Sequence, residues 1–146
     1  MDDFPGTPPT PVGVDLLDRQ HQRVHALLAE TMRALELDPD DPGAEDRFKE
    51  VFLANVVHFK AEEDYLEGRG FPDLIPHRFE HELLLDWFRE ALARRCGPHA
   101  QPLAAVVREA ADLIRGHRET VDRAYVDWLE AQGRSIQPPP STSSPS

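Results

Sequence analysis

The chain has 146 residues, of which 40 % are hydrophobic, and its 16 basic against 27 acidic residues give a formal net charge of −11. This length suits one domain with a single core. Such a negative charge disfavours polyanionic partners, so we expect neither nucleic acid nor an anionic membrane face among them. The one cysteine, Cys96, excludes an internal disulfide and any cysteine-based zinc or iron–sulfur site, and an unpaired thiol is typical of a cytoplasmic protein.

The first residues, MDDFPGTPPTP, lack the basic region and the apolar run of a secretory signal. The longest apolar stretches, such as VFLANVV over 51–57, are too short to cross a bilayer. We therefore expect a soluble protein with no membrane partner.

Prolines divide the middle of the chain into four segments. They come as three pairs, Pro39/Pro42, Pro72/Pro76 and Pro98/Pro102. Because proline breaks a helix interior but is tolerated in its first turn, the pairs predict three turns between four helices. In each segment the apolar residues recur at steps of three and four, which is typical of an amphipathic helix. The expected helices cover about 15–37, 42–67, 73–95 and 102–132.

The ends of the second helix carry specific signals. We expect Asp41 to be its N-cap and Pro42 to occupy its first helical position. Gly68 and Gly70 then predict its end, since glycine readily adopts the left-handed conformation beyond a helix C-terminus.

Four helices joined by short turns predict an all-α fold, an antiparallel up-down-up-down four-helix bundle over 12–132. We expect a monomer, because the apolar stripes are all used by the core. The flanking segments 1–11 and 133–146 are rich in proline or serine, which predicts disorder. The C-terminal segment is either a tether to another molecule or dispensable.

The histidines lie where an ordinary bundle would have apolar residues. Buried imidazoles and carboxylates without partners cost several kcal/mol, so a core that contains several of them needs something to satisfy them. The i, i+4 pairs His58/Glu62 and His77/His81 each stack on one helix face, whereas His117 and Asp122 are i, i+5, which is looser. Neutral imidazoles with carboxylates fit a borderline transition metal, although spacing alone leaves zinc and iron both open. The residues concerned are His21, His58, Glu62, His77, His81, His117 and Asp122.

Nucleophilic catalysis has no good candidate in the sequence. Cys96 lies at a predicted helix end away from the histidines, and the serines are concentrated near the C-terminus. We expect His99 to be exposed in a turn. The tyrosines and tryptophans (Tyr65, Tyr125, Trp87, Trp128) fit packing positions, and Glu63 is expected to point away from the metals.

Four blocks of sequence together resemble the hemerythrin family, specifically its bacterial single-domain members. They are VGVDLLDRQHQ (12–22), HFKAEE (58–63), GFPDLIPHRFEH (70–81) and HRETVD (117–122). The resemblance implies a non-haem diiron centre with two iron ions and an oxo or hydroxo bridge. One iron would be bound by three of the matched histidines and the other by two, with two carboxylates bridging them. The first iron would be bound by His77, His81 and His117, and the second by His21 and His58. The bridging carboxylates would be Glu62 and Asp122.

In two octahedral ions, this ligand set and the bridge leave a single open position, on the iron of His21 and His58. The resemblance implies that dioxygen binds there reversibly in a tight apolar pocket, for storage, delivery or sensing. An unidentified redox or delivery partner is one possibility that goes with this function.

The chain departs from the family pattern at His25, one turn after His21, where the family usually has an apolar or aromatic residue. His25 is either a helix-edge residue or a hydrogen-bond donor near bound oxygen. The second possibility favours an alternative function on the same scaffold, a diiron enzyme such as a peroxidase, an oxidase or a nitric-oxide-handling protein.

Overall fold

The computed structural model describes residues 4–6 and 8–136. Its long helices are α1 (Asp15–Leu37), α2 (Ala44–Arg69), α3 (Leu74–Ala93) and α4 (Leu103–His117). A single 3-10 turn, Arg94–Cys96, follows α3, and the described part of the chain contains no strand. The predicted all-α fold is therefore confirmed. No helix within 4–6 and 8–136 has the length and apolar character that spanning a membrane requires.

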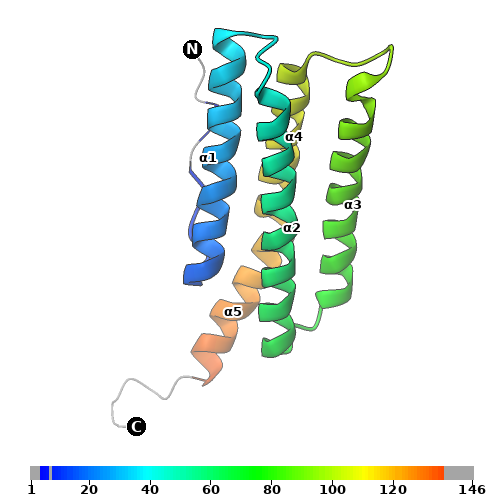
Figure 1. The fold of residues 1–146 in the computed structure, drawn as a ribbon. Helices are drawn as coiled ribbons and strands as arrows, with labels where there is room; N and C mark the ends of the chain where they lie inside the picture. Colours follow the sequence, from blue (N-terminus) through cyan, green and yellow to red (C-terminus); the bar gives the residue numbers. More distant parts are fainter. Residues whose placement is uncertain (1–3, 7, 137–146) are drawn as a thin grey trace.

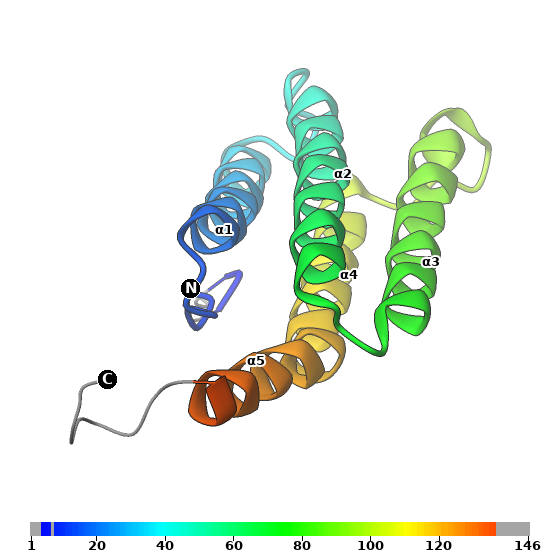
Figure 2. The same cartoon turned by 90° about the horizontal axis from the view of Figure 1, so that it is seen from below.

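Consecutive helices run in opposite directions and form a four-helix bundle (Figure 1). The turns over 38–43 and 97–102 lie at the top of that view, and the turn over 70–73 lies at the bottom. Seen from below, α1, α2, α3 and α4 surround a common interior, and α5 crosses beneath it (Figure 2).

The second helix begins later than its proline suggested. Its N-cap is Gly43, and Asp41 precedes it in a tight turn. The Asp41 carboxylate accepts a hydrogen bond from the Gly43 N–H at 3.1 Å, and its carbonyl accepts one from the Ala44 N–H at 3.2 Å. Asp41 thus stabilises the turn before the helix, an arrangement common for aspartate. At the other end only Gly70 is left-handed, with φ 75°, whereas Gly68 is still inside α2.

The fourth predicted helix is interrupted by a change of helical type. After α4, residues Arg118–Asp122 form a π-helix, and α5 (Arg123–Ile136) resumes the α-helical hydrogen-bond pattern. The helix continues to Ile136, beyond the boundary predicted at 132. Of the C-terminal segment 133–146, residues 137–146 lie outside the described part of the chain.

The interior of the bundle has two halves of different chemistry. The half nearer the 38–43 turn, called the apolar half below, consists mainly of hydrocarbon and aromatic packing around Phe48 and Phe88, whose ring centroids are 5.5 Å apart. Its buried Thr31 hydroxyl donates to the Leu27 carbonyl at 2.7 Å. The half nearer the 70–73 turn, called the histidine half, contains the buried imidazoles and carboxylates. A small second apolar cluster of Leu66, Phe71 and Tyr125 closes the histidine half from below.

Part of the segment 1–11 lies against the bundle, although its composition favoured disorder. Phe4 packs against the core, with the Arg108 guanidinium 5.4 Å from its ring centroid. Further along, the Asp18 carboxylate accepts hydrogen bonds from the N–H groups of Val12, at 2.7 Å, and Gly13, at 3.2 Å. These contacts fix the direction in which the chain enters α1.

Candidate metal centre

The structure brings all seven predicted metal ligands together in the histidine half. They come from every long helix, and none of their side chains is more than 8 % exposed. The amphipathic spacing explains this convergence, since each residue replaces an apolar residue on the inward stripe of its helix. The seven are His21 of α1, His58 and Glu62 of α2, His77 and His81 of α3, His117 of α4 and Asp122 of the π-helix.

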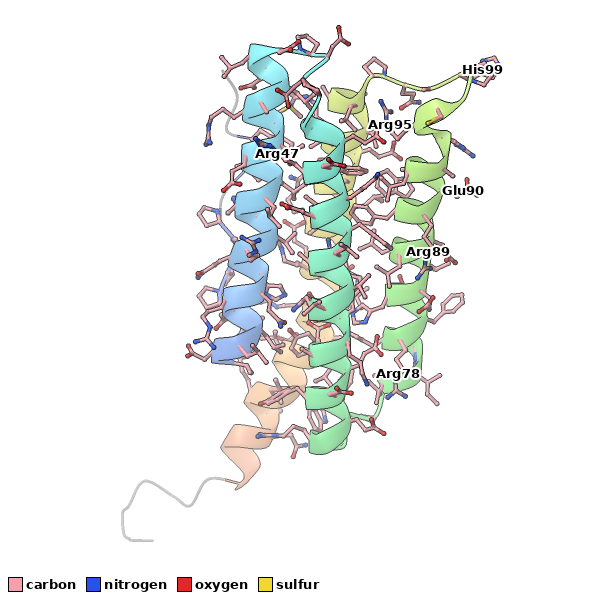
Figure 3. All side chains as sticks on the ribbon, in the orientation of Figure 1. Arg47, Arg78, Arg89, Glu90, Arg95 and His99 are labelled. Atoms are coloured by element: carbon pink, nitrogen blue, oxygen red, sulfur yellow. The ribbon has the colours of Figure 1, made fainter. Side chains whose placement is uncertain are left out.

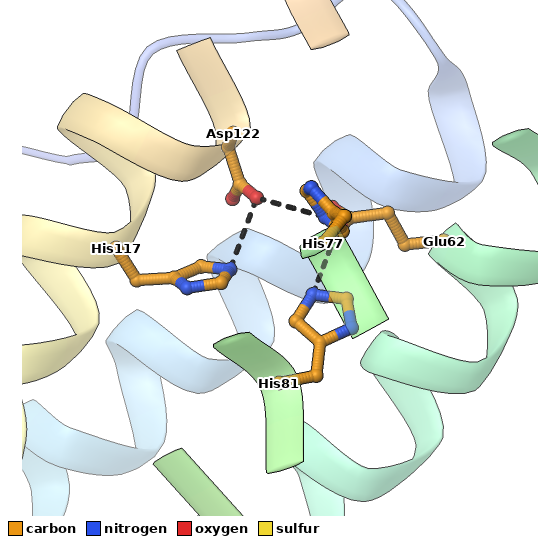
Figure 4. Close-up of side chains that lie close together, drawn as sticks. All are labelled: Glu62, His77, His81, His117 and Asp122. Carbon is orange, nitrogen blue, oxygen red and sulfur yellow. Dashed lines mark hydrogen bonds and ion pairs between the residues drawn. The ribbon is translucent and has the colours of Figure 1, made fainter. Parts of the chain in front are cut away.

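The larger of two ligand groups contains three histidines (Figure 4). The Nε2 atoms of His77 and His81 lie 2.7 Å and 3.0 Å from the same Glu62 oxygen, Oε1. The Nε2 atom of His117 lies 3.1 Å from Asp122 Oδ1. The ligand atoms of this group all lie within 4.8 Å of one another.

The smaller group contains two histidines and the same two carboxylates. His58 Nε2 lies 3.3 Å from Glu62 Oε2, and His21 Nε2 lies 3.7 Å from Asp122 Oδ2. Each carboxylate therefore turns one oxygen toward the three-histidine group and the other toward the two-histidine group. This arrangement would allow both carboxylates to bridge two cations, if one were bound at each group.

Several buried polar atoms of the cluster have no hydrogen-bond partner. They are the Nε2 atoms of four histidines, the Nδ1 atom of His21 and both oxygens of Asp122. An unsatisfied buried polar group costs about 1–3 kcal/mol, so a protein does not collect several of them without compensation. The donor set, imidazole nitrogens and carboxylate oxygens aimed at common points, fits a metal ion. The four histidines are His21, His58, His81 and His117.

The pKa values of two ligands, His21 and Glu62, are shifted toward the protonation states that a metal requires, whereas the pKa of His117 is raised, by the neighbouring Asp122 carboxylate against the effect of burial. Burial, and then the nearby His58, lower the pKa of His21 to about 4. Burial alone would raise the pKa of Glu62, but the imidazoles of three histidines, whose Nε2 atoms lie 2.7–3.3 Å from its oxygens, hold that pKa well below its usual range. Neutral imidazole and ionised carboxylate are the ligand forms, so less free energy is spent on displacing protons when a metal binds.

The π-helix explains the spacing of His117 and Asp122. An α-helix places residues i and i+4 on one face, but a π-helix closes its hydrogen bonds at i+5. We had expected the carboxylate to reach back across a looser angle. Instead the backbone itself, over Arg118–Asp122, brings Asp122 to the face that carries His117.

Outside the ligands, hydrogen bonds fix the orientation of the imidazole rings. His81 Nδ1 donates to Glu63 Oε2 at 2.6 Å, and Arg78 in turn lies 3.4 Å from the other oxygen of Glu63. His58 Nδ1 donates to Gln20 Oε1 at 2.8 Å. Such partners select the tautomer that leaves Nε2 free to bind a metal and increase ligand basicity.

Two residues outside the ligand set, Glu63 and Tyr125, have more specific roles in the structure than the sequence predicted. Glu63 does point away from the cluster, but its side chain is only 20 % exposed and it orients His81. Tyr125 is fully buried, and its hydroxyl donates to Glu62 Oε2 at 2.9 Å, so it is more than a packing residue. The position of Glu63 next to the predicted ligand Glu62 could have indicated its role from the sequence. Nothing in the sequence indicated the role of Tyr125, because its partner is far away along the chain.

The remaining candidates lie off the cluster. His25 is only partly buried and lines neither cavity beside the histidines, although its Nδ1 atom is buried without a partner. His99 is exposed at the opposite end of the molecule, as predicted (Figure 3). Cys96 is a free, exposed cysteine in the turn after α3.

A small cavity, called the inner cavity, lies beside the two-histidine group. Its volume of about 10 Å³ is the room of one water-sized molecule. Apolar side chains make up part of its wall, and Asn55 and Arg118 are its polar residues outside the ligand set. The apolar ones are Val24, Phe59, Leu84 and Ile114.

Comparison with known proteins agrees with this chemistry. Residues 12–129 match the family model described as the hemerythrin HHE cation binding domain. A bacteriohemerythrin from Ralstonia nicotianae is 31 % identical over 85 residues, an alignment that covers 58 % of this chain and 62 % of that protein. The chain therefore matches less than two thirds of that relative's length. No solved structure gives a significant match.

Proposed function

This chain belongs to the hemerythrin family, and from that premise we propose that it is a non-haem diiron protein that binds dioxygen reversibly. The relative from Ralstonia nicotianae is named as a bacteriohemerythrin, which supports the same proposal. Two bound iron ions supply the redox chemistry for reversible binding of oxygen. The protein residues provide the ligands, the open position and the shelter from water.

The proposal gives each ligand a role. His77, His81 and His117 hold one iron, and His21 and His58 hold the other. Glu62 and Asp122 bridge the two ions. What supports this division is that Glu62 directs Oε1 to His77 and His81 but Oε2 to His58.

The unequal histidine numbers are the single observation that carries the functional proposal. One ligand group has three imidazoles and the other has two, while both share the same carboxylates. An ion held by the second group would therefore have one protein ligand fewer than the first, and the inner cavity adjoins this group at His21 and His58. The apolar part of its wall, Val24, Phe59, Leu84 and Ile114, limits the access of water and protons there, which favours release of dioxygen over its reduction.

The decisive experiment loads the protein with iron and follows its optical spectrum through an oxygen cycle. We expect about two irons per chain, and charge-transfer bands that appear with oxygen and disappear on its removal. A chain that binds only zinc, or that shows no bands, would contradict the proposal. Bands that persist after oxygen is removed would instead support a diiron enzyme.

That second candidate, a peroxidase, oxidase or nitric-oxide-handling enzyme, is favoured by one feature of the inner cavity. Its wall includes the amide of Asn55 and the guanidinium of Arg118, and the charge of Arg118 also acts on His25. A donor near bound oxygen would stabilise or protonate it. If His25 has this role, His25→Phe changes the autoxidation rate, and an unchanged rate excludes it.

We further propose that the protein acts as a cytoplasmic monomer in oxygen storage, delivery or sensing, with a redox or delivery partner. The absence of a candidate span within the described helices is compatible with this location. Sedimentation of the iron-loaded chain tests the monomer, and a dimer would contradict it.

A further inference from the structure

A larger cavity, called the outer chamber, lies next to the two-histidine group. Its volume is about 150 Å³, and His21 and Asp122 belong to its wall. Residues 8–12 of the N-terminal segment cover one side of it, and α4, the π-helix and α5 form the other. Figure 2 shows this segment between α1 and α5. The chamber has room for several water-sized molecules.

Three arginines line the outer chamber, and one of them has no salt-bridge partner. Arg115 pairs with Asp112 at 2.6 Å, and Arg123 lies 3.4 Å from Asp127. Arg118 makes no hydrogen bond and no ion pair within 4.0 Å with any residue that the structure describes. It is half-buried, and a guanidinium stays charged in proteins. Arg118 therefore presents to the chamber a cation without a direct ion pair, on which the charges of Asp122 and Glu119 act from a greater distance.

Arg118 also lies between the two cavities. It belongs to the wall of the outer chamber and to the wall of the inner cavity, together with His21 and Asp122. Its charge acts on both His21 and His25 of α1. A ligand in the outer chamber is therefore close to Arg118 and to His21 and Asp122 at the same time.

The N-terminal wall offers few competing donors. Pro8, Pro9 and Pro11 have no backbone N–H, and the Val12 N–H is already bonded to Asp18. Thr10 alone remains to donate from that side. The polar recognition of any occupant must therefore come mainly from the arginines on the opposite wall.

The charges of the wall favour an anion. The three arginines of the wall outnumber its two acidic residues, Glu119, which is exposed, and Asp122. The Asp122 oxygens lie 3.1 Å from His117 Nε2 and 3.7 Å from His21 Nε2. Bound cations would offset the charge of Asp122 and add positive charge of their own. Positive potential in a recessed site raises the local concentration of anions and their rate of entry.

We propose that the outer chamber binds a small monovalent anion through Arg118 and delivers anionic ligands to the two-histidine metal position. The delivery step rests on the proposed function; the binding of the anion in the chamber does not. Arg118 is then a specificity residue that distinguishes anionic from neutral ligands of similar size.

Chloride tests the chamber without reference to metal chemistry. The line width of the ³⁵Cl resonance is measured with the chain as purified, and with Arg118→Gln and Arg123→Gln. We expect Arg118→Gln to remove most of the protein-dependent broadening. Arg123→Gln, whose arginine is paired with Asp127, retains most of it. Equal broadening in wild type and Arg118→Gln would overturn the proposal.

Azide tests delivery in the oxidised, iron-loaded protein by stopped flow. We expect Arg118→Gln to slow azide binding by about tenfold at low ionic strength and added salt to reduce the difference. Arg118→Lys, which keeps the charge, retains most of the rate and serves if Arg118→Gln does not fold. Nitric oxide, which is neutral, binds the reduced variants at the wild-type rate.

The outcomes separate the two proposals. Equal slowing of azide and nitric oxide would assign Arg118 a steric role and overturn the delivery proposal. A chain that takes up no iron would refute the proposed function, while the chloride measurement would still decide whether the chamber binds anions.

Discussion

The apolar half and the histidine half of this bundle are built from the same helices, yet their side chains are satisfied in different ways. Around Phe48 and Phe88, close packing alone compensates the entropy of folding. Around Glu62 and Asp122, buried polar atoms remain without hydrogen-bond partners. The apolar half can be complete as a folded chain, whereas the histidine half is complete only with a ligand that the chain does not encode.

This contrast predicts that stability and metal content can be changed separately. Substitutions in the apolar half should lower the free energy of unfolding and leave the metal sites intact. Substitutions in the histidine half should reduce the metal content and change the free energy of unfolding little. Four experiments test the contrast, in order of decreasing expected effect.

The largest effect is expected for Glu62→Gln. Because Glu62 contributes an oxygen to each ligand group, its loss should abolish binding of both metals, while His21→Gln should remove only one. Metal per chain, measured by plasma mass spectrometry, distinguishes these results. Glu67→Gln, an exposed glutamate of the same helix that pairs with Arg78, is the control and should bind as wild type. One metal retained in Glu62→Gln would contradict the bridging role.

Phe88→Ala probes the apolar half. The side chain is fully buried, so the cavity should cost about 3–5 kcal/mol of unfolding free energy in urea. The exposed Phe79 of the same helix is the matched control, and its substitution by alanine should cost less than about 0.5 kcal/mol. Both variants should keep wild-type metal content while folded. Loss of metal in folded Phe88→Ala would show that the halves are coupled.

Acid should destabilise the metal-free protein through His21. Its pKa of about 4 in the folded state is below the ordinary 6.5, so the unfolded state binds more protons between these values. Stability therefore falls as pH drops from about 6.5 to 4, by at most about 3 kcal/mol from this group. Glu62, whose pKa is lowered from 4.5, acts below this window, and His117, whose pKa is raised from 6.5, acts above it.

Urea unfolding at several pH values, with His21→Gln beside wild type, measures this contribution, and imidazole resonances give the pKa directly. His25 also has a lowered pKa, from burial and then from Arg118, so His25→Gln is the necessary comparison. A pKa of His21 near 6.5 in the folded, metal-free protein would contradict the prediction.

The smallest effect is expected for Glu63→Gln. The amide keeps the size of the side chain but weakens its hydrogen bond to His81 Nδ1, which is 2.6 Å long. We expect metal affinity to fall about tenfold, measured by competition with a chelator. Glu67→Gln is again the control. Unchanged affinity would mean that packing against Phe59, whose ring stacks on His81 at 3.9 Å, suffices to orient the imidazole.

Periodicity in the sequence predicted the helices and the shared face of the ligands, because both follow from local geometry. A histidine at an inward position remains inward when the helix packs, so His58 and His81 needed no structure to be identified. The position of Pro42 misled us about the start of α2, since the side chain of Asp41 stabilises a turn there instead.

Other features depend on partners far away in sequence. The bond from Tyr125 to Glu62 and the contact of Arg78 with Glu63 join different helices. The place of Arg118 between two cavities depends on an N-terminal segment whose composition suggested disorder. No local pattern marks such residues, because their surroundings exist only after the bundle has assembled.

The π-helix over Arg118–Asp122 also limits which changes in chain length this protein can tolerate. One extra residue in a helix rotates everything after it by about 100°. If a single residue were deleted between His117 and Asp122, a regular α-helix would become possible. His117 and Asp122 would then be four residues apart, so the α-helix would still place Asp122 on the metal-facing side and Tyr125 near Glu62. One inserted residue would instead rotate Asp122 off that side and turn Tyr125 away from Glu62. The number of residues between His117 and Asp122, rather than their identity, therefore determines the position of Asp122 and of the hydrogen bond from Tyr125 to Glu62.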